Sequence, residues 1–204
     1  MKNPKFKYFE ELESTNTYAM KNLSVLSDMD IIVASKQTNG RGQFERKWIS
    51  DKQNNVYLSI VLKPSCALEK LPLVNFSQYT SVVICRILKE YGVSAGIKYP
   101  NDVLVQGEKI AGILCESSIC GTVLKGLVIG IGINLNLEQG DVKKVDQPAT
   151  SLNLLIKKPV DRNLFIDKLI CEFLKNYEPF LQQGFEFIKQ EYALLDISSD
   201  KSFI

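Results

Sequence analysis

Two apolar runs on either side of a basic, glycine-containing stretch constrain this fold more than any other feature of the chain. The runs cover residues 31–34 and 56–62. Both are rich in β-branched residues and bounded by turn-forming residues, so each is a predicted strand. Residues 35–49 lie between the two runs and contain the only Trp of the chain. Their sequence is S-K-Q-T-N-G-R-G-Q-F-E-R-K-W-I. Because long connections are usually functional, we expect a ligand site where this one meets the strands.

The side chains of this connection suit a phosphate and a nucleobase. Gly40 and Gly42 let the backbone approach a ligand closely or take a positive φ. Arg41 and Arg46 carry positive charge, and backbone amides together with Arg bind phosphate well. Trp48 offers a flat apolar face for a base. The same residues also suit a solvated, mobile basic loop whose Trp packs on the core, and this stretch alone does not separate the two interpretations.

The complete absence of His narrows the chemistry. It excludes Ser-His-Asp and Cys-His catalysis and zinc sites that use His ligands. Any reaction must rely on Lys and Arg to neutralise charge, on a metal bound by carboxylates, and on positioning of the reactants. This favours phosphoryl or nucleotidyl transfer over hydrolysis.

Composition also limits the cellular setting. A net charge of +2 does not favour nucleic acid as a partner. The five Cys are an odd number without a C-x-x-C pair, so we expect reduced, mostly packed thiols. No apolar run is long enough to span a membrane, and no secretory signal begins the sequence. We therefore predict a cytoplasmic protein that does not contact membranes.

The remaining periodicities predict one domain in which strands and helices mix. We expect a short strand over 5–9 and a helix that starts at a Ser14 or Thr15 cap and ends near 27–28. A helix over 72–91 should end at Gly92. The other expected elements are an antiparallel meander over 103–105, 109–116 and 123–133, a loop over 138–150, a short helix over 151–155, a long helix from 161 to Gly184, and a helical piece over 185–195.

Several polar residues in this apolar framework are candidate ligand contacts. Lys98 and Lys109 are placed at predicted strand starts, and Asn101 and Asp102 follow the first of them. A single Lys there would more simply snorkel to solvent, but two beside an Asn-Asp pair favour a site. The glycines of G-I-G-I-N at 130–134 lack the third Gly of a dinucleotide motif, so we interpret them as sites of close packing or ligand approach.

Five motifs in fixed order then resemble the biotin–protein ligases, which attach biotin to the carboxyl-carrier domain of biotin-dependent carboxylases. The motifs are E-S-T-N (13–16), Q-T-N-G-R-G-Q-F-E-R-K-W (37–48), K-Y-P-N-D (98–102), K-I-A-G-I-L (109–114) and G-I-G-I-N (130–134). The resemblance runs from about Phe9 to about Leu195. It implies an α/β (α+β) fold, with a mixed, largely antiparallel sheet flanked by helices as in class II aminoacyl-tRNA synthetases and lipoate ligases.

The resemblance also implies a two-step reaction and assigns residues to it. Biotin and Mg-ATP would form biotinyl-5′-AMP and pyrophosphate, and a carrier lysine would then take the biotinyl group. Lys109 is the foremost catalytic candidate, with Arg41. The implied biotin contacts are Ser14, Thr15, Asn16, Gln37, Gly40, Arg41, Gly42, Gln43, Lys109, Gly112 and Leu114. The implied ATP and adenylate contacts are Arg41, Arg46, Trp48, Lys98, Asn101, Asp102, Lys109 and Asn134, with Asp102 also a candidate ligand of Mg²⁺.

The chain departs from the family pattern at two motif positions. Gln43 replaces the second Arg of G-R-G-R, and Tyr99 replaces the Trp of K-W-P-N-D, which is a conservative change. Loss of that cation removes one group that could retain the adenylate, and leakage of the adenylate would be the consequence if nothing replaced it. Our hypothesis is that the Gln43 amide still retains it, and an equally fast adenylate release from Gln43→Gly would contradict this. We also expect residues 37–48 to be mobile without ligand and to order over the adenylate.

Further expectations concern domains and partners. The motifs begin by Glu13, which leaves no room for the N-terminal DNA-binding domain of some members, so we predict no specific DNA binding. We divide the chain into a catalytic domain over 1–196 and a remnant or first strand of a C-terminal β domain over 197–204. The expected partner is a biotin carboxyl carrier domain of a carboxylase, and the protein is expected to be a monomer or a homodimer.

Two other functions compete with biotin ligation. The first is a lipoate ligase or octanoyl transferase of the same fold, although those families carry different glycine-rich motifs. The second is a non-catalytic biotin sensor or adenylate-binding regulator, which a truncated C-terminus and the change at Gln43 favour and which Lys109 and Arg41 disfavour. Turnover separates these functions, because a sensor binds biotin without releasing pyrophosphate.

Overall fold

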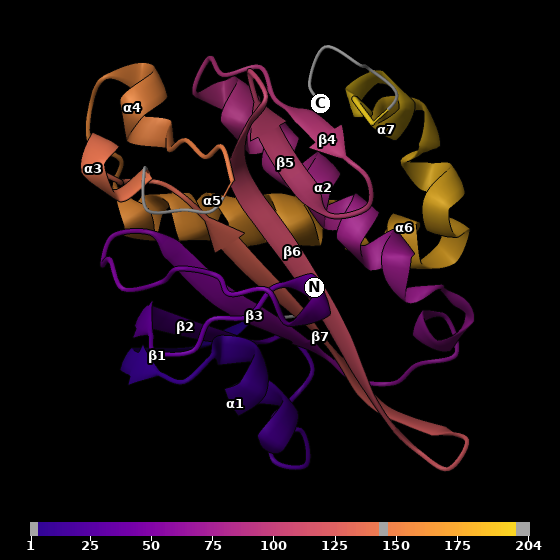
Figure 1. Cartoon of the computed structure of the whole chain (residues 1–204). Helices are drawn as coiled ribbons and strands as arrows, with labels where there is room; N and C mark the ends of the chain where they lie inside the picture. The colour runs from indigo at the N-terminus through magenta and orange to yellow at the C-terminus, as the bar shows by residue number, and fades with distance from the viewer. Residues whose placement is uncertain (1–3, 143–146, 199–204) are drawn as a thin grey trace.

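The computed structural model describes residues 4–142 and 147–198, which build one seven-stranded sheet with helices on both faces (Figure 1). The strand order is β1-β2-β3-β7-β6-β5-β4. Only β1 and β2 pair in parallel, and all other neighbours are antiparallel. The expected mixed, largely antiparallel sheet is therefore confirmed. The strands are β1 (Lys5–Leu12), β2 (Asp30–Gln37), β3 (Val56–Leu62), β4 (Gly96–Lys98), β5 (Asp102–Val105), β6 (Glu108–Cys120) and β7 (Val123–Ile133).

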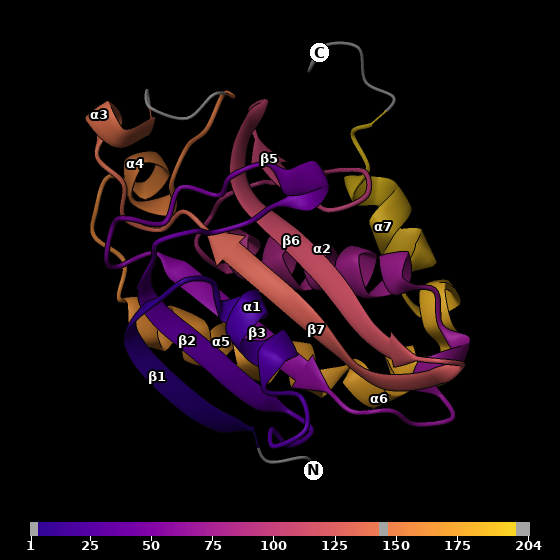
Figure 2. The same cartoon turned by 60° about the horizontal axis from the view of Figure 1, so that its bottom comes forward.

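The helices divide unequally between the two faces of the sheet. Figure 2 shows α1 on one face, while α2, α5, α6 and α7 cover the other. The connection between β2 and β3 runs across β6 and β7 on the α1 face. Beside α1, a large area of this face of the sheet is covered by no helix. The helices are α1 (Thr15–Lys21), α2 (Leu73–Glu90), α3 (Gln139–Val142), α4 (Leu152–Ile156), α5 (Arg162–Lys175), α6 (Tyr177–Gln183) and α7 (Lys189–Leu195), with 3₁₀ turns η1 (Gln43–Glu45), η2 (Leu68–Lys70) and η3 (Gly184–Phe187).

Side-chain alternation along the central strands explains this division. Successive residues of a strand point to opposite faces. On β7, Ile129, Ile131 and Ile133 all enter the main core under α2 and α5. Gly130 and Gly132 face the other way, where they present almost no side chain. The large apolar residues therefore collect on one face, and the other face is left open for polar groups.

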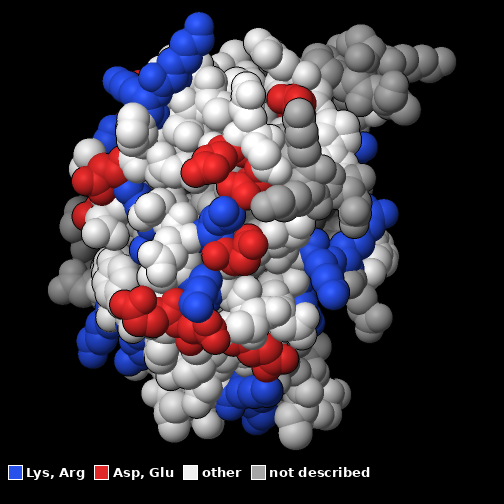
Figure 3. Space-filling view, turned by 60° about the vertical axis from the view of Figure 1, so that its left-hand side comes forward, with Lys and Arg blue, Asp and Glu red and all other residues white. Residues whose placement is uncertain are grey.

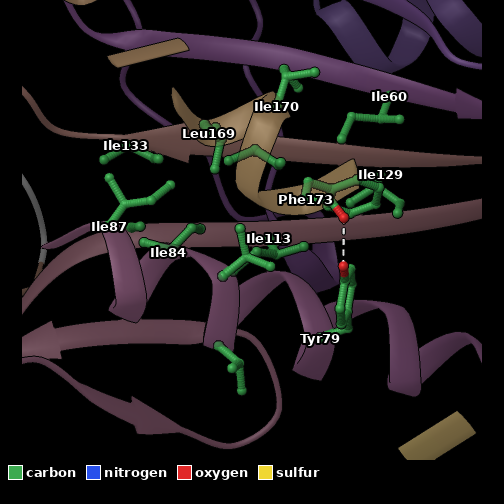
Figure 4. Close-up of a cluster of buried hydrophobic side chains, with 14 of the residues drawn as sticks. Ile60, Tyr79, Ile84, Ile87, Ile113, Ile129, Ile133, Leu169, Ile170 and Phe173 are labelled. Atoms are coloured by element: carbon green, nitrogen blue, oxygen red, sulfur yellow. Dashed lines mark hydrogen bonds between the residues drawn. The ribbon is translucent and has the colours of Figure 1, made fainter. Parts of the chain in front are cut away.

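The main core joins three helices through one tyrosine. Tyr79 of α2 is fully buried and donates its hydroxyl hydrogen to the Phe173 carbonyl of α5 over 2.5 Å (Figure 4). Its ring stacks on Phe180 of α6 with centroids 4.3 Å apart. Burial raises the pKa of the Tyr79 hydroxyl, so it stays protonated and remains a donor. A smaller cluster on the other face holds α1 against the sheet, through Ala19, Leu23, Leu26, Ile32, Val61 and Val128.

Three predicted elements were wrong in detail, and the errors in the two helices have local causes. α1 ends at Lys21 rather than near 27–28, because the Asn22 side chain donates to the Tyr18 carbonyl over 2.8 Å and competes with the helical pattern. The long helix after 161 breaks after Lys175, because Pro179 would clash with that carbonyl in a continuous helix. Residues 138–150 are not all loop, since they include α3, and residues 143–146 lie outside the described residues.

The expectation that the thiols are mostly packed was also wrong. All five Cys are free, but Cys66, Cys120 and Cys171 are exposed and only Cys85 is fully buried. Cys120 ends β6 at the tip of the β6–β7 hairpin, which Figure 1 shows projecting beyond the helices. Burial raises the pKa of the Cys85 thiol to about 12. Within the described part of the chain, no helix is long and apolar enough to cross a membrane.

The last described residues lie along the outer edge of β4. The Ile197 N–H donates to the Ile97 carbonyl over 3.0 Å, and the Ser198 hydroxyl accepts from the Tyr99 N–H over 2.7 Å. Residues 199–204, the rest of the proposed C-terminal remnant, lie outside the described residues. On the face shown in Figure 3, cationic and anionic side chains are interspersed rather than gathered by sign.

Two leucine-to-alanine changes test the position of the core. Leu169 on α5 is completely buried, whereas Leu194 on α7 is 88% exposed. We expect Leu169→Ala to lower the free energy of unfolding by about 2–5 kcal/mol, because it leaves a cavity. Leu194→Ala should change it by less than about 0.5 kcal/mol. Urea unfolding followed by circular dichroism measures both, and equal effects would contradict the assignment of the core.

Candidate functional site

A cavity of about 270 Å³ opens on the α1 face of the sheet, and most of the predicted site residues line it. They come from the start of α1, from the connection between β2 and β3, from the turn between β4 and β5, and from β6 and β7. The predicted residues in its wall are Ser14, Thr15, Asn16, Gln37, Arg41, Gly42, Gln43, Arg46, Trp48, Lys98, Asn101, Asp102, Lys109, Gly112 and Leu114. The structure therefore brings together groups that are far apart in the sequence, such as Ser14 and Leu114.

A second, smaller cavity of about 50 Å³ adjoins the first. Trp48 and Lys109 line both cavities and so stand at their junction. Asn134 lines only the smaller one, where its side chain donates to the Thr150 carbonyl over 3.0 Å. Gly40 lines neither cavity, because it packs tightly behind the lining against the Trp48 carbonyl.

The floor of the larger cavity depends on two glycines of β7. A Cβ at Gly130 would overlap the side-chain oxygen of Asn16, and a Cβ at Gly132 would lie 2.5 Å from Cε2 of Trp48. Any side chain at either position would therefore push away the helix or the indole. This is the physical reason for glycine in the G-I-G-I-N motif, and it confirms the interpretation that these glycines serve close packing.

Polar groups at the start of α1 form one buried hydrogen-bonded set. Ser14 is the N-cap and accepts from the Thr17 N–H. The Thr15 N–H donates to Oε1 of Gln37 over 2.8 Å, and Ser59 Oγ donates to Oδ1 of Asn16 over 2.6 Å. Ser14, Thr15 and Asn16 are each only 3% exposed. Such a set holds its donors and acceptors in fixed directions, as a polar ligand requires.

The cationic part of the site surrounds Lys109. Its Nζ lies 2.7 Å from Oδ1 of Asp102 and 5.4 Å from the centroid of a Trp48 ring. Asn101 supports this arrangement by donating to the Ile113 carbonyl over 2.8 Å. Lys98, which ends β4 rather than beginning a strand, is exposed at the rim. Positive charge thus meets an aromatic face at the junction of the two cavities.

The Trp48 indole occupies a position suited to a planar ligand. Its Nε1 is buried and makes no hydrogen bond to any residue that the structure describes. Its ring packs against Gly132 on one side, while the smaller cavity opens beside it. Stacking on a nucleobase remains a prediction, but the ring is available to such a ligand.

Few carboxylates are available for a metal ion here. In residues 4–142 and 147–198, no group of three or more His, Cys, Asp or Glu could hold one. Asp102 is the carboxylate in the wall of the larger cavity, and it already pairs with Lys109. A Mg²⁺ ion is commonly bound by one or two carboxylates together with substrate phosphates. The donor set therefore fits a Mg²⁺ that arrives with a nucleotide, and Asp102 remains its predicted ligand.

The motifs missed two polar residues on the open face of the sheet. Ser59 of β3 contacts Asn16, as described above, and Glu116 of β6 binds both Arg41 and Asn16. Strand alternation could have found both, since Glu116 follows Gly112 and Leu114 on the same face of β6. Gln147, which lines both cavities, follows the 143–146 gap and carried no recognisable sequence signal.

The single Trp gives a direct test of the glycine floor. We expect Gly132→Ala to displace the indole of Trp48, because the added Cβ would lie 2.5 Å from it. The emission maximum should move to longer wavelength, and acrylamide quenching should increase. Gly140→Ala is the matched control, because a Cβ there would meet nothing within 4 Å. Unchanged emission and quenching in Gly132→Ala would contradict the packing described.

Comparisons with known proteins agree with this site. The model of the biotin/lipoate A/B protein ligase family matches residues 8–134. The bifunctional ligase/repressor BirA of Bacillus subtilis (strain 168) is 36% identical over 168 residues, which is 80% of this chain and 51% of that protein. A biotin–[acetyl-CoA-carboxylase] ligase of Paracoccus denitrificans is 32% identical over 171 residues, covering 80% of this chain and 69% of the relative.

The fold comparison leads to the same group of proteins. The biotin protein ligase from Aquifex aeolicus in complex with biotin and ATP superposes with a TM-score of 0.79 and is 25% identical. The match covers 95% of this chain and 78% of that one. The chain nevertheless spans only about half the length of the BirA relative it matches.

Proposed function

The chain belongs to the biotin/lipoate A/B protein ligase family, and on that premise we propose that it activates biotin with ATP and transfers it to a lysine of a biotin carboxyl carrier domain. The observation that carries this proposal is the position of Lys109, which lines both cavities beside Trp48. The larger cavity would hold biotin and the smaller one adenine. Lys109 would then lie where the carboxylate meets the α-phosphate.

The proposed chemistry explains why cations gather at that junction. A free carboxylate is a poor electrophile, so its oxygen first attacks the α-phosphorus of ATP, and the bond to the β-phosphate oxygen breaks to release pyrophosphate. Lys109 and Arg41 would stabilise the negative charge that builds up in this step. The amine of the carrier lysine then attacks the acyl carbon, AMP leaves with the bonding electrons, and the nitrogen loses a proton. A Mg²⁺ bound by Asp102 would help neutralise the nucleotide phosphates.

Biotin is favoured over lipoate by the chemistry of the pocket wall. The buried hydroxyl and amide groups of Thr15, Asn16 and Ser59 suit a polar ring system that can donate and accept hydrogen bonds. The apolar body of a lipoyl or octanoyl chain could not use the hydrogen-bonding capacity that these groups present, and a site built to hydrogen-bond its ligand discriminates against an analogue that lacks such groups. The names of the ligases from Paracoccus denitrificans and Aquifex aeolicus support the same choice.

Biotin-dependent ATP–pyrophosphate exchange tests the first step. We expect exchange with biotin but not with lipoate or octanoate, and Lys109→Ala should reduce it about 10²- to 10³-fold. Lys168→Ala is the matched control, because Lys168 pairs with Glu90 on the helical side of the molecule. Biotin binding without any exchange would favour the sensor function, and exchange with lipoate alone would overturn the choice of substrate.

Transfer to a carrier domain tests the second step. We expect labelled biotin to appear in a stable amide bond on one lysine of an isolated biotin carboxyl carrier domain, as mass spectrometry can locate. A variant of that domain in which the lysine is replaced by Arg should remain unlabelled. Labelling of unrelated proteins to the same extent would instead indicate release of the adenylate into solution.

The prediction of no specific DNA binding stands beside this proposal, and a tight operator-like complex at physiological salt would contradict it.

A further inference from the structure

Glu116 introduces a negative charge beside a pocket that, on the proposed function, must bind two anions. Its side chain is 25% exposed and lies on the open face of β6. Its oxygens lie 3.0 and 3.1 Å from Nη2 of Arg41, and Oε2 accepts from Nδ2 of Asn16 over 2.8 Å. A carboxylate here repels the carboxylate and phosphate of the ligand. Its presence therefore requires a compensating role in the site.

Its position relative to the cavity indicates that purpose. Arg41 and Asn16 line the larger cavity, whereas Glu116 does not. Glu116 therefore lies behind two lining residues and contacts both of them. They belong to separate parts of the chain, since Asn16 lies in the first turn of α1 and Arg41 belongs to the connection between β2 and β3. Glu116 therefore joins these two parts of the chain directly.

The geometry leaves Arg41 able to bind a ligand at the same time. Both contacts with Glu116 use one nitrogen, Nη2, whereas a guanidinium carries five N–H donors. The remaining donors are free of this carboxylate and can meet an anion in the cavity. Asn16 is held in a similar way, because its Nδ2 donates to the Leu114 carbonyl over 3.0 Å as well as to Glu116.

We propose that Glu116 is a positioning residue that aligns Arg41 and Asn16 for the biotin carboxylate and ring. A charge-assisted pair confines the long Arg side chain before the ligand arrives, so less conformational entropy is lost on binding. This inference rests on the proposed function and names one residue that would set the affinity of that site for biotin. If Glu116 instead withheld Arg41 from the ligand, removal of its charge would tighten biotin binding.

The test measures biotin binding by calorimetry and exchange kinetics on the full chain. Glu116→Gln keeps the size of the side chain and removes its charge. We expect it to weaken biotin binding about tenfold and to raise the KM for biotin equally, with a smaller rise in the KM for ATP, because Asn16 faces biotin alone whereas Arg41 is shared with the nucleotide. Glu116→Asp keeps the charge and should recover part of the loss. Glu90→Gln is the matched control, because it breaks the exposed pair with Lys168 away from the site.

A double-mutant cycle separates positioning from a general structural effect. Arg41→Ala should weaken biotin binding less in the Glu116→Gln background than in the wild type, because both changes remove the same interaction. Strictly additive effects, an unchanged affinity in Glu116→Gln, or tighter binding in that variant would each overturn the proposal. These results differ from failure of the proposed function, in which the wild type itself would show no biotin-dependent exchange.

Discussion

The close approach of α1 and Trp48 to the bare face of β7 is the constraint on which the rest of the structure depends. Gly130 and Gly132 allow it, because any Cβ there would displace Asn16 or the indole. A sheet face that must stay bare cannot also supply the hydrophobic core. The core is therefore concentrated on the opposite face, where α2, α5 and α6 pack around Tyr79 (Figure 4).

Two cations beside this bare face are held by carboxylate partners. Lys109 has Asp102 as its partner, and Arg41 has Glu116. Each cation is thus balanced before a ligand binds, which limits the cost of partly burying it. Each carboxylate also restrains the direction in which its cation points. Two cations of the site are thus held in ion pairs, while Arg46, Lys47 and Lys98 add further positive charge to the wall of the larger cavity.

The sequence was informative where local rules decide the structure. The strands were predictable because β-branched runs alternate with turns such as Gln106-Gly107, whose positive φ values of 53° and 84° close the β5–β6 hairpin. The apolar stripe of the predicted helix runs past Lys175 at helical spacing, so periodicity alone did not predict the break that Pro179 causes. The motifs contain most of the residues that line the larger cavity, and Glu116 was missed because it lies two residues beyond the end of one motif. The partners of Arg41 and Lys109 depend on tertiary contacts that no local pattern encodes.

Residues 196–198, which lie along the outer edge of β4, connect the end of α7 to the turn that precedes β5. Tyr99 donates its N–H to the Ser198 hydroxyl, Asn101 lies in the same turn, and Asp102 begins β5 directly after it. The Asp102 carboxylate in turn holds Lys109. The end of α7 is therefore linked, through a single short chain of contacts, to the cation at the junction of the two cavities. Local fraying of the last helix would release this edge contact of the turn, whereas the pairing of Asp102 with Gly112 of β6 would still hold the carboxylate beside Lys109.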